Sequence, residues 1–201
     1  MGTVMCLLPN WKCGPVRLDP RAPLVLDTRE LGRRPGSERT VSVTAPAPAD
    51  LGIEVLGVPE GSPVTFELRL EAVVEGVLVT GRAHAELTGE CVRCLDAIQR
   101  GIDADLCELF VYDDPERQHA GAAESEDGET SRMEGDLIDL EPLLRDAVVL
   151  GLPFQPTCTD DCPGLCVECG TRLADDPGHA HEAAVDPRWA ALQRLSTQQE
   201  T

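Results

Sequence analysis

Six cysteines in two short stretches constrain most strongly how this chain can fold. GECVRCLD, at 89–96, holds one close pair, and PTCTDDCPGLCVECG, at 156–170, holds four more cysteines. Zinc takes four ligands in a tetrahedron, about 2.3 Å from each thiolate, and two cysteines separated by two residues can turn around one ion. Gly170, directly after the last cysteine, allows the turn a positive φ. The spacing predicts a metal site, with six candidate ligands: Cys91, Cys94, Cys158, Cys162, Cys166 and Cys169.

Spacing alone leaves the ligand set open. One quartet combines the two pairs that have two residues between their cysteines. A second combines the earlier pair with the two cysteines that lie three residues apart, and a third uses only the four later cysteines. Six candidates for four places also allow a shared or a second site. His179 and His181 could supply a nitrogen ligand, although we interpret them as tail residues.

The expected metal is structural zinc, because four thiolates leave no open coordination position for a substrate. The same ligands can also bind an iron–sulfur cluster. A cysteine pair with this spacing can act as a redox dithiol, but the strand-to-helix setting of thioredoxin-like pairs is absent here. The chain has no glycine-rich phosphate loop, nucleophile motif or histidine-rich metalloprotease helix. We therefore expect a protein that is not an enzyme.

Charge limits the partners that the chain can bind. Its 201 residues include 17 Lys and Arg against 36 Asp and Glu, which gives 17 − 36 = −19. The stretch 103–141 alone carries fourteen acidic and two basic side chains. Such a chain is repelled by bare phosphate backbones. No run is apolar enough for a membrane span or a signal peptide, which predicts a cytoplasmic protein without membrane contact. That compartment keeps thiols reduced, so clustered cysteines favour metal binding over disulfides.

Alternating apolar and polar residues predict three strands in the middle of the chain. VTFELRLEAVV, from residue 64, and VLVTGRAHAELTG, from residue 77, are joined by a tight turn at Glu75 and Gly76. IDADLCELFVY, from residue 102, supplies the third strand, with Cys107 as a thiol outside the metal site. His84 is expected on the surface. With only two Trp, one Tyr and three Phe, the core must be aliphatic.

Two helices are predicted beyond the strands. In DLIDLEPLLRDAVVLGLP the apolar residues recur at helical spacing, with Asp139 as N-cap and Pro142 in the first turn. In VDPRWAALQRL, Asp186 is the expected N-cap and Pro187 the first helical residue. The fold class is α+β: a β-rich central antiparallel sheet with a packed helix and a cysteine-rich, zinc-binding C-terminal segment.

The chain is divided by composition. Residues 1–17 form an unstructured extension, which can include codons upstream of the true start. Residues 18–155 form the α+β body, in which the acidic, glycine-rich loop 113–135 is disordered because it has too few large apolar groups to offset the entropy of ordering. Residues 156–182 form the cysteine-rich segment, which closes onto the body. A short helix and tail follow at 183–201.

Four motifs, in order, resemble the YceD family, the large ribosomal RNA subunit accumulation proteins, in the form found in high-GC Gram-positive bacteria. They are LVTGRAHAELTGECVRCL, DLEPLLRDAVVLGLPFQPTC, CPGLCVECGTRLADDP and DPRWAAL, and the resemblance spans roughly 18–195. It implies a role in the synthesis, processing or stability of the large-subunit ribosomal RNA, hence in ribosome biogenesis, without enzymatic activity. Some family members lack much of the later cysteine cluster.

The acidity restricts how such a protein acts on RNA. It lacks the basic groove and the aromatic platform of an RNA binder. We therefore expect indirect action, in which 103–141 helps to hold a basic ribosomal protein or ribonuclease, or the large-subunit precursor. One alternative is a direct RNA-binding zinc protein, with a local basic patch of Arg93, Arg100 and Arg172. A second alternative is a cysteine-based redox or metal-sensing switch.

Overall fold

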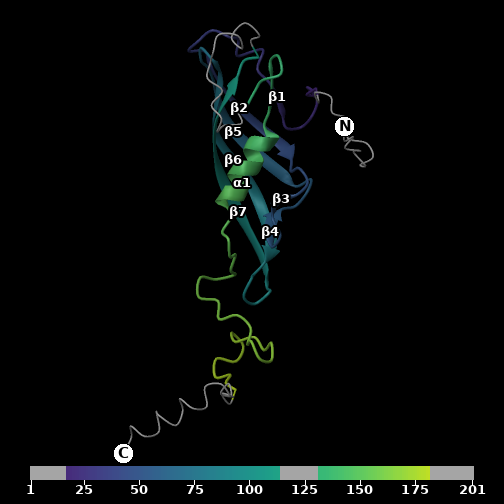
Figure 1. Cartoon of the computed structure of the whole chain (residues 1–201), viewed down its shortest axis with the longest axis vertical. Helices are drawn as coiled ribbons and strands as arrows, with labels where there is room; N and C mark the ends of the chain where they lie inside the picture. The colour runs from purple at the N-terminus through teal and green to yellow at the C-terminus, as the bar shows by residue number, and fades with distance from the viewer. Residues whose placement is uncertain (1–16, 114–130, 182–201) are drawn as a thin grey trace, which may run out of the picture.

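The computed structural model describes residues 17–113 and 131–181 of the chain (Figure 1). The expected extension at the N-terminus, most of the expected acidic loop and the expected C-terminal helix lie outside the described residues. A β-sheet with a helix across one face forms the body. The cysteine-rich segment continues beyond the lower end of the sheet in Figure 1.

The two longest strands of the fold form an antiparallel hairpin. Strands β6 (Gly76–Glu90) and β7 (Ala97–Val111) pair along their whole length, from Gly76 opposite Val111 to Glu90 opposite Ala97. Alternation along both strands places one set of side chains in the core and the other in solvent. This confirms the predicted strands, of which β6 begins one residue and β7 five residues before the expected start. The loop that closes the hairpin carries the first cysteine pair.

Four further strands complete the sheet at the other edge of β6. Strand β5 (Pro63–Ala72) pairs with the first half of β6, and β2 (Glu38–Pro46) pairs with β5. Strand β4 (Leu56–Val58) pairs with the far end of β6, and β3 (Leu51–Ile53) pairs with β4. The sheet is therefore antiparallel and six-stranded, as expected for a β-rich protein. Strands β2, β3 and β4 were not predicted.

A two-stranded sheet precedes the helix. Strands β1 (Val25–Asp27) and β8 (Leu137–Asp139) pair antiparallel. Strand β8 leads directly into α1 (Glu141–Gly151), the helix that Figure 1 shows in front of the sheet. The predicted N-cap was one residue early, because Leu140 occupies the cap position. The Asp139 carboxylate still accepts a hydrogen bond from the Glu141 N–H at 2.9 Å, so it satisfies one free donor of the first turn.

The core lies between the sheet and α1 and is aliphatic, as composition predicted. The alternating residues of β5 are fully buried, and Leu144 and Val148 of α1, which lies against β7 and β3, belong to the same buried cluster. The opposite face of the sheet is polar. There Arg82 donates to Asp105 at 2.8 Å, and His84, exposed as expected, lies 2.9 Å from Asp103.

A candidate metal centre at the end of the hairpin

The hairpin loop and the segment after α1 together form a cluster of four cysteines, Cys91, Cys94, Cys158 and Cys162. Their sulfur atoms all lie within 4.8 Å of one another. The sulfurs of Cys91 and Cys162 are 3.8 Å apart, and those of Cys94 and Cys158 are 3.5 Å apart. Four thiolates around one zinc ion stand about 3.8 Å apart, given the zinc–sulfur distance. This four-cysteine cluster could hold a metal ion.

Backbone hydrogen bonds shape the turn between Cys91 and Asp96. The Leu95 N–H donates to the Cys91 carbonyl at 2.9 Å, and the Cys91 N–H donates to the Asp96 carbonyl at 2.8 Å. Leu95 takes a left-handed conformation with φ 64°. The Val92 N–H donates to the Pro156 carbonyl at 3.0 Å, which attaches the later segment to the turn. The turn therefore points the sulfur atoms of Cys91 and Cys94 toward Cys158 and Cys162 of the later segment.

The thiols of this cluster differ in acidity. Burial would raise the pKa of Cys91, but the backbone N–H groups of Cys94, Arg93 and Cys158 donate to its sulfur and lower the pKa from 9.0 to about 6. Burial raises the pKa of Cys162. One thiolate is thus available near neutral pH, and the other sulfurs must release protons when a metal binds.

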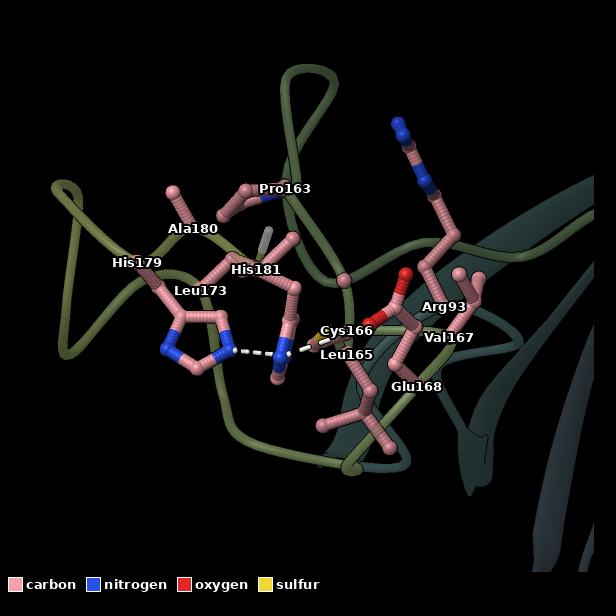
Figure 2. Close-up of a pocket in the computed structure, with 11 residues that line it drawn as sticks. Arg93, Pro163, Leu165, Cys166, Val167, Glu168, Leu173, His179, Ala180 and His181 are labelled. Carbon is pink, nitrogen blue, oxygen red and sulfur yellow. Dashed lines mark hydrogen bonds and ion pairs between the residues drawn. The ribbon is translucent and has the colours of Figure 1, made fainter. Parts of the chain in front are cut away.

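A second cluster lies further along the chain and combines Cys166, Cys169, His179 and His181. The Cys169 sulfur is 3.2 Å from Nε2 of His179 and 3.3 Å from Nε2 of His181. Figure 2 shows the two imidazoles side by side near Cys166, with their ring planes at 82° and 2.9 Å between their Nε2 atoms. The structure thus places both histidines beside Cys166 and Cys169, which favours the alternative that they supply nitrogen ligands. We call this group the mixed cluster; it too could hold a metal ion.

The structure separates the later cysteines into two groups. Cys158 and Cys162 join the hairpin pair, whereas Cys166 and Cys169 join the histidines. Among the described residues the structure therefore brings together the second of the expected quartets and adds a second cluster. The spacing of the cysteines did not assign the two histidines to a metal site. The sequence feature that could have indicated them is their separation by a single residue, shortly after the last cysteine. Cys107 lies exposed on β7 and belongs to neither cluster.

The two clusters are joined through the backbone. The Leu165 N–H donates to the Arg93 carbonyl at 3.0 Å. Gly164 has φ 81°, and a Cβ there would lie 3.1 Å from the same carbonyl oxygen, so the close approach favours glycine. The Arg172 guanidinium also forms an ion pair with Asp96, in the hairpin loop. An open groove of about 600 Å³ lies beside the mixed cluster and is partly lined by Arg93 (Figure 2).

The three arginines expected to form a basic patch have different surroundings. Arg93 borders this groove, and Arg100 is exposed on β7, opposite Leu87 of β6. Arg172 is paired with two carboxylates, those of Asp96 and Asp175. The charge of this third arginine is therefore largely offset within the protein.

The fold and these clusters define a β-rich protein with cysteine and histidine groups that could hold metal ions. The family model of the large ribosomal RNA subunit accumulation protein YceD matches residues 79–196, and the chain belongs to this family. The family name implies involvement in the accumulation of large-subunit ribosomal RNA, and the family is not known for enzymatic activity. None of the described helices is long and apolar enough to cross a membrane.

Several curated proteins are similar in sequence. An uncharacterized protein of Mycobacterium tuberculosis (strain H37Rv) is 44% identical over 171 residues, which cover 85% of this chain and 80% of that protein. An uncharacterized protein of Mycobacterium leprae (strain TN) is 42% identical over 85% of this chain and 76% of its own length. The chloroplastic large ribosomal RNA subunit accumulation protein YCED homolog 1 of Zea mays is 27% identical over 53% of this chain and 41% of its own. No solved structure matches the chain significantly.

Proposed function

We propose that this protein is a non-enzymatic factor in large ribosomal subunit biogenesis that acts by holding a basic ribosomal protein or ribonuclease. Family membership is the observation that supports the ribosomal role. The net charge of −19 supports a basic protein as the direct partner, because opposite charges speed the encounter of two proteins. On this proposal the contact with ribosomal RNA is indirect, and the protein works in the cytoplasm.

The exposed face of the sheet offers an acidic surface for such a partner. Its arginines are already engaged: Arg69 is 2.6 Å from Glu38, and Arg82 is 2.8 Å from Asp105. Exposed carboxylates outnumber these arginines on the same strands, so the face keeps a negative excess. The exposed carboxylates of this outer acidic face include Glu38, Glu67, Glu86, Asp103 and Asp105.

The ion pairs of Arg172 argue against direct RNA binding. Phosphate contacts require arginine or lysine side chains that are free to replace counterions. Arg172 is held by two carboxylates, Asp96 and Asp175, and releasing it would expose both negative charges to the RNA. A basic patch of three arginines at this end of the molecule is therefore the weaker candidate.

We assign a structural zinc ion to the four-cysteine cluster. Three of its four cysteines are buried, and four thiolates complete a tetrahedron without an open position. The ion would connect the hairpin loop with the segment after α1, two regions that are otherwise linked near this point by backbone hydrogen bonds and the ion pair of Arg172 with Asp96. Its role would be to hold the C-terminal segment against the sheet.

Depletion of the protein in its source organism tests the ribosomal role. The expected result is a fall in large-subunit ribosomal RNA relative to small-subunit ribosomal RNA. The wild-type gene should restore the ratio, and the Cys107→Ser variant, altered outside both clusters, should restore it equally. An unchanged ratio after depletion would contradict the ribosomal role.

An internal deletion, combined with two substitutions, tests the acidic partner surface. The segment to delete is 114–130, because Met133 is buried and Arg132 forms a β-bridge with Val111. With Glu86→Gln and Asp103→Asn added on the outer acidic face, binding to the basic partner should weaken and lose much of its salt dependence. Unchanged binding, or tight binding of bare large-subunit RNA fragments in gel shifts, would refute the indirect mechanism.

A further inference from the structure

We propose that the mixed cluster is a second zinc site, separate from the four-cysteine cluster. Its donors are two thiolates and two imidazole nitrogens, a combination that zinc takes in closed structural sites. In such a site a sulfur and a nitrogen stand about 3.6 Å apart, and two nitrogens about 3.4 Å apart. The observed separations, 3.2 and 3.3 Å from the Cys169 sulfur and 2.9 Å between the imidazoles, are slightly shorter. A small outward movement of these exposed and half-buried side chains would fit the ion.

Both imidazoles are oriented as metal ligands are. Nδ1 of His179 lies 3.5 Å from the Asp176 carboxylate, and Nδ1 of His181 lies 3.3 Å from the Glu168 carboxylate. A carboxylate beside Nδ1 keeps the ring proton on that nitrogen, so the Nε2 lone pair is free for a metal. In each ring it is Nε2 that faces the cluster. Figure 2 shows His181 between Glu168 and His179.

The cysteine turn of the mixed cluster repeats the turn of the four-cysteine cluster. The Gly170 N–H donates to the Cys166 carbonyl at 2.9 Å, and the Cys166 N–H donates to the Thr171 carbonyl at 2.8 Å. These two bonds have the same spacing and nearly the same lengths as those of the turn that begins at Cys91. The residue after the second cysteine has a positive φ in both turns, 75° at Gly170 and 64° at Leu95. The chain thus builds the same ligand-presenting turn twice.

The segment that carries the mixed cluster has almost no core of its own. Within 163–181, all of which the structure describes, Gly164 is the one buried residue, and no helix or strand is present. Burial of apolar surface therefore contributes little to holding this segment in one conformation. A segment of this kind needs a cross-link, and metal binding supplies one. The defined positions of four ligands in such a segment support a metal site over chance proximity.

The second site is built onto the first. Its segment is attached to the hairpin loop through the Leu165 N–H on the Arg93 carbonyl and the ion pair of Arg172 with Asp96. Both attachment points lie within the turn that the four-cysteine cluster organises. Loss of the four-cysteine cluster should therefore weaken the second site, whereas loss of the second site should leave the first intact. This order of dependence distinguishes two coupled sites from two independent ones.

Zinc content of the full-length, reduced protein tests the proposal, with native mass spectrometry after saturation with zinc alone. The wild type should bind two ions, and the double variant His179→Ala with His181→Ala should bind one. The double variant Cys91→Ser with Cys94→Ser should bind at most one, and more weakly than the wild type binds its second. His84→Ala and Cys107→Ser, altered outside both clusters, should keep two.

Cobalt substitution of the wild type provides a measurement that needs no folded variant. Thiolate-to-cobalt absorption should grow in two phases, four sulfurs in the first and two in the second, in line with the two donor sets. A single zinc ion in the wild type at saturation, or two ions in the double histidine variant, would overturn the second site. The single-ion result would leave the four-cysteine cluster and the ribosomal role untouched, because the depletion assay tests that role separately.

Discussion

Cys91 and Cys162 are separated by 71 positions in the sequence, yet their sulfur atoms lie 3.8 Å apart. Both side chains are buried at the end of the β6–β7 hairpin, and each belongs to a different part of the chain. The contact shows that the cysteine-rich segment is attached to the sheet at this point. A metal ion at the four-cysteine cluster would cross-link these two parts of the chain, and the first prediction depends on it.

Replacing Cys162 with Ser should remove the ion of the four-cysteine cluster and destabilise the protein. Loss of a structural metal belongs to the mechanisms that cost more than about 4 kcal/mol in the free energy of unfolding. Metal analysis and denaturant unfolding of the reduced protein measure both effects. Cys107→Ser is the matched control, because that thiol is exposed and outside the clusters. Equal metal content in the two variants would contradict the assignment.

Replacing Leu144 with Ala should destabilise the body, because this side chain of α1 is fully buried at 0% exposure. The cost should be about 2–5 kcal/mol, which includes the lost burial and the remaining cavity. Leu150→Ala on the same helix is the control, since Leu150 is 84% exposed and its loss should change stability by less than about 0.5 kcal/mol. Similar unfolding free energies for the two variants would show that α1 does not pack as described.

Leu95→Gly should stabilise the hairpin loop. Leu95 has φ 64° and is 61% exposed. Its left-handed conformation therefore destabilises the folded state, and burial of its side chain compensates for little of this. Glycine avoids that cost, and the gain should approach about 1 kcal/mol. The reciprocal change Gly170→Leu, at φ 75°, should lose a similar amount. Thermal unfolding of the zinc-loaded protein measures both changes, and a destabilised Leu95→Gly variant would refute the argument.

The pKa of His84 should lie above its ordinary value of 6.5, because Nδ1 of the imidazole is hydrogen-bonded to Asp103 and the carboxylate favours the charged ring. A raised pKa in the folded state gives stability that is complete below the unfolded value. That stability is lost as the pH rises through the folded value. NMR titration of the His84 ring measures the shift.

Asp103→Asn should return the His84 pKa toward 6.5 and remove the corresponding pH dependence of unfolding. Asp105→Asn serves as its control, because Asp105 pairs with Arg82 rather than with His84. If His84 titrates at the same pH in the Asp103→Asn variant as in the wild type, the hydrogen bond does not set its pKa.

Local patterns predicted the central strands well. Alternation in β5, β6 and β7 reflects a sheet with one face in the core, and that pattern is readable wherever the strand is long. Strands β3 and β4 have three residues each, too few for a period to appear. Strand β2 was missed because its inward residues are small or half-buried, with Val41 and Val43 between Ser and Thr, so its apolar contrast is weak.

The two cysteine turns follow from the sequence, because the spacing of two residues brings paired sulfurs together within one short stretch of backbone. The aliphatic core and the acidic charge follow from composition. Which pairs share a cluster depends on the tertiary structure. That choice depends on the pairing of Glu90 with Ala97, which places the hairpin loop, and on the Val92 to Pro156 hydrogen bond, which brings the later segment to it. Contacts between residues so far apart follow from the register of the sheet and the path of the chain after α1. The local spacing of residues predicts neither of them.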